Sequence, residues 1–267
     1  MREYRRFIWQ SALGYLESRT DMKLVREHMT DCKCDQPAMS FSEIYLRLLQ
    51  SLINKRGMPN SIGRIEELRP IFYGFDHQKT LQVYPTWEEL FTTIKTHQKP
   101  KSRMDKANPH NYWVIFCRGS LSTANYLSRF STPTEFLEYV HDFDKNPNTR
   151  PALPFLMGHE IFGYGFALAC DFLKEIGFDN YSKPDQHLID IFSGLGISDE
   201  SQLEIFRTVT LLATEVGETP YAVDKAFWLI GSGRLYRNNL TFQTDKKEFV
   251  RQVKENWAKG KERRTNG

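Results

Sequence analysis

The sequence predicts an all-α protein built from many short helices. In most segments the apolar residues recur three and four positions apart, which is the spacing of one helix face; an example is the set Ile44, Leu48, Leu49 and Leu52. Serine, threonine or aspartate stands before several of these segments, where a helix N-cap is expected. Glycine and proline separate the segments from one another. Together these signals predict helices joined by short loops.

The N-terminal half is expected to hold four or five of these helices. The expected ranges are 1–30, which contains one or two helices, 41–54, 61–69 and 86–96. Thr86, with Glu89 three residues later, forms the capping-box pattern that marks a helix start. The polar and basic stretch 97–110 predicts an exposed loop, either merely solvated or in contact with a DNA backbone.

The C-terminal half gives similar signals. Helices are expected over 131–143, with Pro133 in the first turn, over 199–215, with Asp199 as N-cap, and over 219–233, while 144–154 reads as a loop. Asp224 stands early in the last of these helices, where the helix dipole favours acids, so a structural role is favoured. The basic segment 245–264 predicts a surface helix or a partly disordered tail that adds nonspecific DNA affinity.

Composition bounds the class of protein. A chain of 267 residues that is 40% hydrophobic can bury a sizeable core. The net charge of +3 does not by itself indicate a nucleic-acid partner, because a local basic face is hidden in the mean. No apolar run reaches the roughly 18–20 residues of a membrane span, and the N-terminus lacks a signal-peptide core.

The four cysteines form no disulfide framework, which indicates a reducing, cytoplasmic setting. Cys32 and Cys34 are too closely spaced for a usual zinc knuckle, and no paired Cys/His set follows them. Ordinary loop thiols are therefore favoured over a metal site.

Residues 161–192 carry the clearest functional signal. The run 162–166, Phe-Gly-Tyr-Gly-Phe, predicts a glycine hairpin before an amphipathic helix, and Gly177 suits the position after that helix. Two glycines one residue apart expose backbone N–H groups at the start of the second helix. These groups can bind a phosphate, because they have no helical partner and the helix dipole favours an anion. A plain helix–turn–helix packing joint is the alternative.

A second landmark follows at a fixed separation. Asp185 lies 22 residues after Gly163, and His187 lies two residues further on. This combination resembles the helix-hairpin-helix (HhH-GPD) DNA glycosylase superfamily, which includes endonuclease III, the adenine glycosylases and the 8-oxoguanine glycosylases. The resemblance is sharpest over 158–192 and extends, without sharp motifs, over about 40–232.

The resemblance implies a two-lobed helical fold. One lobe would be a helical bundle over 40–180 that contains the helix-hairpin-helix motif at about 155–177. The other would combine 1–39 with 181–267. Asp185 would then lie at the mouth of the cleft between the lobes.

The resemblance also assigns roles to individual residues. It implies a phosphate clamp made by Gly163, Tyr164, Gly165, Phe166 and Ala167. It implies that Asp185 performs base excision and that His187 contacts a phosphate. Weaker expectations are a monovalent cation on the backbone carbonyls of His159, Ile161 and Tyr164, and no other cofactor.

Two further groups of residues are candidates for contact with the DNA, and each also has a purely structural explanation. In the glycosylase family that the chain resembles, the loop after the first bundle helix often supplies a residue that fills the space left by a flipped base. The resemblance therefore implicates Asn54, Arg56 or Met58. A plain polar turn is the alternative. Trp113 or Phe116 would stack on the extruded base, or would simply belong to the core.

The chain departs from the family pattern at two points. Bifunctional members carry a lysine two residues after the second hairpin glycine, and here that position is Ala167. The enzyme should therefore be monofunctional, unless Lys183 substitutes for the missing amine. Some members carry an iron–sulfur cluster near the C-terminus, but this chain has no cysteine beyond Cys170.

The function implied is hydrolysis of the N-glycosidic bond of a flipped damaged or modified base in double-stranded DNA, by water that Asp185 assists. The protein would act as a monomer. The alternatives are an inactive helix-hairpin-helix DNA-binding protein, an unrelated helical interaction protein, and a phage-defence glycosylase acting on enlarged bases such as glucosylated pyrimidines. The sequence does not identify the base.

Overall fold

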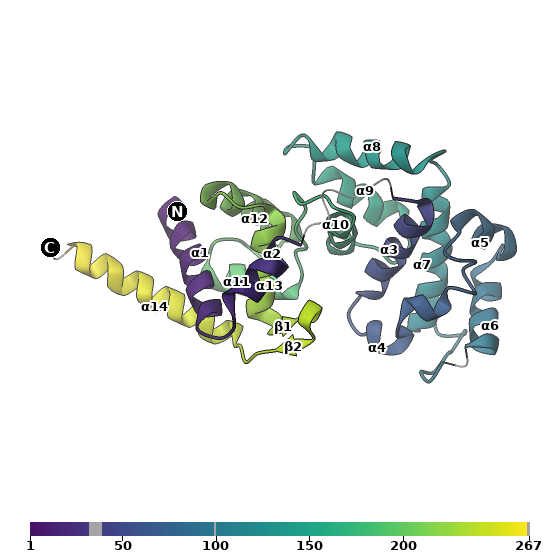
Figure 1. Ribbon diagram of the computed structural model, residues 1–267, viewed down its shortest axis with the longest axis horizontal. Helices are drawn as coiled ribbons and strands as arrows, with labels where there is room; N and C mark the ends of the chain where they lie inside the picture. Colours follow the sequence, from purple (N-terminus) through teal and green to yellow (C-terminus); the bar gives the residue numbers. More distant parts are fainter. Residues whose placement is uncertain (32–38, 99, 266–267) are drawn as a thin grey trace. The chain divides into compact units, whose positions relative to one another are not determined.

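The computed structural model describes residues 1–31, 39–98 and 100–265. The prediction of an all-α protein is confirmed: fourteen α-helices account for most of the described residues, and only two strands of two residues each accompany them (Figure 1). Cys32 and Cys34 lie outside the described residues. No helix in the described ranges combines the length and the apolar character that crossing a membrane requires.

The chain divides into two compact units. The central unit is Asp35–Ile176, and the terminal unit joins Met1–Cys34 to Gly177–Gly267. The elements of the central unit are α3 (Phe41–Ile53), α4 (Pro59–Ile62), the 3-10 helix η1 (Ile65–Leu68), α5 (His77–Val83), α6 (Trp87–His97), α7 (Tyr112–Leu127), α8 (Pro133–Asp144), α9 (Ala152–Glu160) and α10 (Phe166–Glu175).

The elements of the terminal unit come from both ends of the chain. They are α1 (Arg2–Glu17), α2 (Met22–Met29), α11 (Gln186–Leu195), α12 (Gln202–Val216), α13 (Pro220–Ser232), β1 (Arg234–Leu235), the 3-10 helix η2 (Tyr236–Asn238), β2 (Leu240–Thr241) and α14 (Lys246–Thr265). The two strands pair antiparallel.

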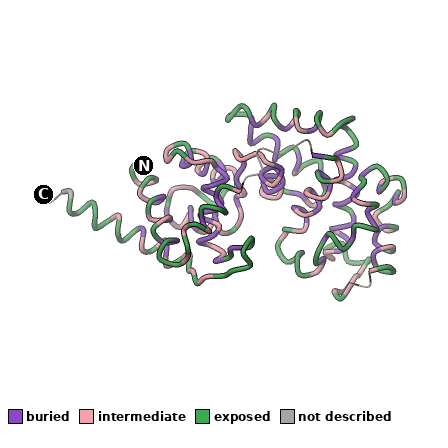
Figure 2. The backbone as a smooth tube through the Cα atoms, in the orientation of Figure 1, coloured by how far each residue is buried: buried purple, intermediate pink, exposed green. Residues whose placement is uncertain are grey.

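Helix α7 is the centre of the central unit. It packs against α3, α5 and α6, and most of its residues are buried (Figure 2). Its exposed residues, Arg118 and Asn125, lie on one face, and the neighbouring helices cover the rest. Helix α10 packs against α9 and α3, so the helix that follows the glycine hairpin is anchored on the same core.

Helix α13 has the corresponding place in the terminal unit. It packs against α11, α12, α1 and α2, and ten of its thirteen residues are buried. Phe227 on α13 meets Phe192 of α11 edge-on, with ring centroids 4.9 Å apart. Because α11 is fixed on this core, the residue that begins it is held in place as well.

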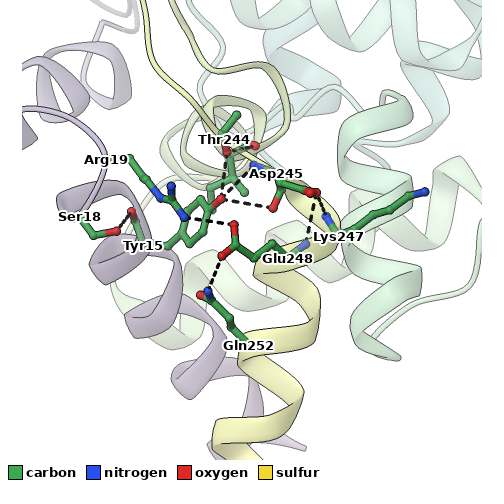
Figure 3. A network of polar contacts seen from close by, with 9 residues as sticks. Tyr15, Ser18, Arg19, Thr244, Asp245, Lys247, Glu248 and Gln252 are labelled. Atoms are coloured by element: carbon green, nitrogen blue, oxygen red, sulfur yellow. Dashed lines mark hydrogen bonds and ion pairs between the residues drawn. The ribbon is translucent and has the colours of Figure 1, made fainter.

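Helix α14 is joined to α1 by a polar network at its first turn (Figure 3). The Tyr15 hydroxyl accepts a hydrogen bond from the Asp245 amide at 3.0 Å, and Arg19 pairs with Glu248 at 3.1 Å. Trp257 packs against Tyr4, with ring centroids 4.9 Å apart and the ring planes tilted by 37°. The basic segment therefore forms a helix, and its last turns run past the other helices of the unit (Figure 1).

The helix starts expected from capping signals are largely confirmed. Ser40 forms a full capping box with Glu43, and the Thr86 side chain accepts a hydrogen bond from the Glu89 amide. Pro133 occupies the first position of α8. These signals act over three or four residues, so sequence alone carries them.

Three expectations about secondary structure are wrong. The helix expected over 61–69 is only the short α4 and η1, separated at Gly63, which has φ +77°. Asp199 is not the N-cap of α12; it accepts a hydrogen bond from the Ser201 amide in a tight turn, and Ser201 takes the cap position. The loop expected over 144–154 ends early, because α9 begins at Ala152. Helices α5 and α7 and the β1–β2 hairpin were not expected.

Candidate nucleic-acid interface and carboxylate site

The glycine hairpin of the central unit connects α9 to α10 through residues 161–165. Gly163 has φ +86°, a conformation that glycine adopts without strain. The turn closes with a hydrogen bond of 3.1 Å from the Tyr164 amide to the Ile161 carbonyl. Gly165 is exposed and takes the N-cap position of α10. Two helices joined by a short glycine-containing turn are therefore present at the predicted position.

Helices α3 and α7 hold this turn in place. The Ser122 hydroxyl accepts a hydrogen bond from the Phe162 amide at 2.8 Å. A Cβ on Gly119 would lie only 3.0 Å from the Phe162 carbonyl oxygen, so glycine permits the close approach of α7. The buried Tyr164 hydroxyl donates to the Leu48 carbonyl, and burial raises the pKa of this phenol so that it keeps its proton.

The hairpin presents backbone donors rather than side chains. In the described part of the chain, the amides of Gly163, Gly165 and Ala167 form no hydrogen bond. Phe166 occupies the first position of α10 and buries its ring. Donors of this kind at a helix N-terminus bind anions, so the geometry suits the predicted phosphate clamp. Tyr164 offers no free donor to a phosphate, because its amide donates to the Ile161 carbonyl and its side chain faces the core.

The carbonyls expected to hold a monovalent cation lie in the same turn. The Ile161 carbonyl already accepts the Tyr164 amide, while His159 lies in the last turn of α9. Among the residues described, no group of three or more His, Cys, Asp or Glu side chains is placed to hold a metal ion. A cation at the hairpin would therefore depend on backbone oxygens.

Arg118 is a residue of this site that the sequence did not identify. Its guanidinium carbon lies 3.9 Å from the centroid of the Phe162 ring, and the Phe162 side chain is 38% exposed. No carboxylate pairs with Arg118 within the described ranges. The cation therefore lies beside the hairpin and is available to an anionic ligand. Sequence gave no signal for it, because the contact depends on how α7 packs against the turn.

Asp185 is the N-cap of α11 in the terminal unit. Its Oδ1 atom accepts hydrogen bonds from the amides of His187 at 2.8 Å and Leu188 at 3.2 Å. The two donors fix the orientation of the carboxylate at a half-buried position. The proposed catalytic carboxylate is thus held in one orientation at the start of a helix.

The loop before Asp185 is fixed by Asp224. The buried Asp224 carboxylate accepts a hydrogen bond of 2.7 Å from the Lys183 amide, and the Lys183 carbonyl accepts the Asp185 amide at 2.8 Å. The structural role expected for Asp224 is therefore to position the backbone that leads to Asp185. The Lys183 side chain is half-buried in the same loop.

His187 packs against α13. A Cβ on Gly231 would lie 2.5 Å from the His187 ring, so only glycine leaves room for it. The ring is half-buried, and its Nδ1 atom is buried with no hydrogen-bond partner among the described residues. Its amide is already engaged by Asp185. A phosphate contact from His187 would therefore have to come from the Nε2 side of its ring, because the amide is engaged and the Nδ1 atom is buried.

Of the three candidates for DNA contact in the loop after α3, two are exposed and one is buried. Met58 is 0% exposed, so the expectation that it fills the space of a flipped base is corrected: its side chain belongs to the core. Asn54 and Arg56 are exposed. The Asn54 side-chain amide donates to Asp171 at 2.8 Å, while the Arg56 side chain projects from a turn closed by Tyr112.

The two aromatic residues considered for the base pocket are also core residues. Trp113 is 2% exposed and Phe116 is 0% exposed, and their rings meet edge-on. The Trp113 indole N–H donates to the Ser102 hydroxyl at 2.7 Å. Both lie on faces of α7 that the neighbouring helices cover, so neither presents a ring to a base in this structure.

Comparisons with protein-family models, with curated proteins and with solved structures give no match to this chain.

Proposed function

We propose that the protein is a monofunctional DNA glycosylase. In this proposal the hairpin of the central unit binds a backbone phosphate of double-stranded DNA, and Asp185 of the terminal unit assists hydrolysis of an N-glycosidic bond. The observation that carries the proposal is the local geometry of the two landmarks. A hairpin offers unpaired backbone donors, and a helix-capping aspartate follows it at the separation that the glycosylase motif has.

The chemistry assigned to Asp185 follows from the reaction. The base must leave the stack before any group can reach the sugar carbon C1′. As the glycosidic bond breaks, positive charge grows on the sugar, and a nearby carboxylate stabilises that charge and orients or deprotonates the attacking water. A carboxylate held by two backbone amides meets this need, because it does not have to reorient during the reaction.

The hairpin supplies position rather than chemistry. Backbone amides read a phosphate without regard to base sequence, and they place the strand while another group acts on the sugar. Arg118, which is held over Phe162, adds a positive charge beside those amides. Loss of either feature should therefore weaken binding to all DNA sequences similarly.

The proposal is tested with a panel of duplexes that carry damaged purines, mismatched bases or glucosylated pyrimidines. Binding is measured at low and at high salt, and free base is measured by mass spectrometry. We expect binding that weakens as salt rises and release of base from at least one substrate. Binding without release from any of them would support an inactive DNA-binding protein. Absence of salt-dependent binding would overturn the DNA function altogether.

A further inference from the structure

The central unit contains an open groove next to the hairpin. Its volume is about 900 Å³, which falls within the range of small-ligand sites. One wall comes from α7, through Arg118, Asn125 and Tyr126, and from Arg129 just beyond its end. The other comes from the turn between α5 and α6 and from the start of α6, where Trp87 is the first residue. Every lining residue belongs to the central unit.

We propose that this groove takes one nucleotide of the DNA strand, adjacent to the phosphate bound by the hairpin. The inference rests on the proposed function and identifies where the strand continues. It assigns the base to the aromatic side chains and the phosphate to Arg118.

Continuity with the hairpin is the first argument. Phe162, the residue before the first hairpin glycine, lines the groove, and Arg118 lies over its ring at 3.9 Å. Ser122, which binds the Phe162 amide, lines the groove as well. A strand whose phosphate contacts the hairpin amides therefore meets the groove at its next nucleotide.

The chemistry of the lining is the second argument. A nucleotide combines a planar ring with an anion, and single strands are bound by aromatic rings together with positive side chains. Arg129 pairs with Glu160 at 2.8 Å, which neutralises that carboxylate, whereas no carboxylate of the described residues pairs with Arg118. Trp87 is half-buried, so part of its ring can stack on a base.

Glu88 lines the same groove, and its negative charge allows a test of whether the bound ligand is an anion. A carboxylate opposes an anionic ligand, so Glu88→Gln should tighten DNA binding. If the groove instead binds a cation, Glu88→Gln should not tighten DNA binding. DNA affinity of Glu88→Gln that is equal to or weaker than that of wild type would therefore contradict the assignment.

The experiment measures DNA affinity by fluorescence anisotropy for Arg118→Ala, Trp87→Ala and Trp87→Phe. Arg69→Ala is the matched control, because Arg69 also lies over an aromatic ring, 5.0 Å from Phe75, but does not line the groove. We expect Trp87→Ala to weaken binding about fivefold or more, as loss of one stacked base does. Arg118→Ala should weaken it similarly, while Trp87→Phe and Arg69→Ala stay near wild type.

Photocrosslinking locates the nucleotide directly. DNA with 5-iododeoxyuridine at successive positions is irradiated with wild-type protein, and the crosslinked peptides are identified by mass spectrometry. We expect one position to crosslink to Trp87 or Tyr126. If wild type binds DNA and releases base, but the groove variants bind normally and crosslinks map elsewhere, the groove assignment fails and the proposed function stands. If wild type does not bind DNA, both fail.

Discussion

Residue 167 determines what the helix after the hairpin can contribute to the chemistry. Strand cleavage by β-elimination proceeds through a Schiff base between the sugar and an amine nucleophile, and Ala167 has no amine. We therefore expect treated DNA to carry intact abasic sites that break only on heating with alkali. Borohydride should trap no covalent adduct between the protein and DNA.

Lys183 is the internal control for that prediction. Its backbone is fixed by Asp224 two residues before the proposed catalytic acid, so its amine is the nearest substitute along the chain. A strong borohydride-trapped band from wild type that disappears in Lys183→Ala would place the enzyme in the bifunctional class instead.

At this scale the sequence identified residues whose signal is local. The amphipathic run Leu188, Ile191 and Phe192 is visible in the sequence directly after Asp185, and the structure places Asp185 at the start of that helix. Two contacts could not be predicted: that of Arg118 on α7 with the hairpin residue Phe162, and that of His187 with Gly231. Both depend on how helices pack against one another. Met58 and Trp113 were wrongly considered as site residues, because the sequence cannot show that an apolar side chain is fully covered.

The hairpin as an element can be tested at one glycine without disturbing the fold. Gly163 needs a positive φ, but Gly165 has φ −147°, and a Cβ there meets no atom within 4 Å. Gly165→Asp should therefore fold normally while placing a negative charge where the phosphate binds. We expect DNA affinity to fall roughly tenfold or more for every sequence, a loss of about 1.4 kcal/mol of binding free energy.

Gly14→Asp is the matched control, because Gly14 is exposed on α1 and a Cβ there also meets nothing within 4 Å. The two variants add the same charge to different units. Equal affinity of Gly165→Asp and Gly14→Asp, with circular dichroism showing intact helices in both, would count against the clamp.

Elements were predictable where capping and periodicity agreed. Helix α3 follows both a capping box and an apolar stripe, and its range was expected almost to the residue. The range 61–69 failed because glycine at 63 adopts a positive φ and divides the segment. Helix α5 was missed because it has only seven residues, which is too short for a periodic signal.

For the whole molecule, buried histidines predict a loss of stability on acidification. Burial lowers the pKa of His28 in the terminal unit and of His77 in the central unit. In both residues the Nε2 atom is buried without a hydrogen-bond partner in the described part of the chain. A proton bound there would carry an uncompensated charge, so the folded protein favours the neutral ring.

The direction of the effect follows from linkage. A histidine whose folded pKa lies below its unfolded value of about 6.5 contributes its full stability above that value. This stability is lost as the pH falls through the unfolded pKa toward the folded one, because only the unfolded chain takes up the proton readily. We expect the midpoint of urea unfolding to fall between about pH 7.5 and about pH 5.5.

His28→Gln should show a smaller fall than wild type over the same interval. His97→Gln is the control, because His97 is exposed. An identical fall in wild type and His28→Gln would show that this histidine does not drive the acid response.

The account as a whole depends on the carboxylate of Asp185, and the most direct measurement is the single-turnover rate of base release by Asp185→Asn. Asparagine still caps a helix, so the variant should fold and bind DNA as tightly as wild type or more tightly. Asp190→Asn is the control, since Asp190 lies on the same helix and pairs with Lys246 at the surface. The account predicts that Asp185→Asn slows release roughly 10²-fold or more while Asp190→Asn does not; near wild-type release by Asp185→Asn would contradict it.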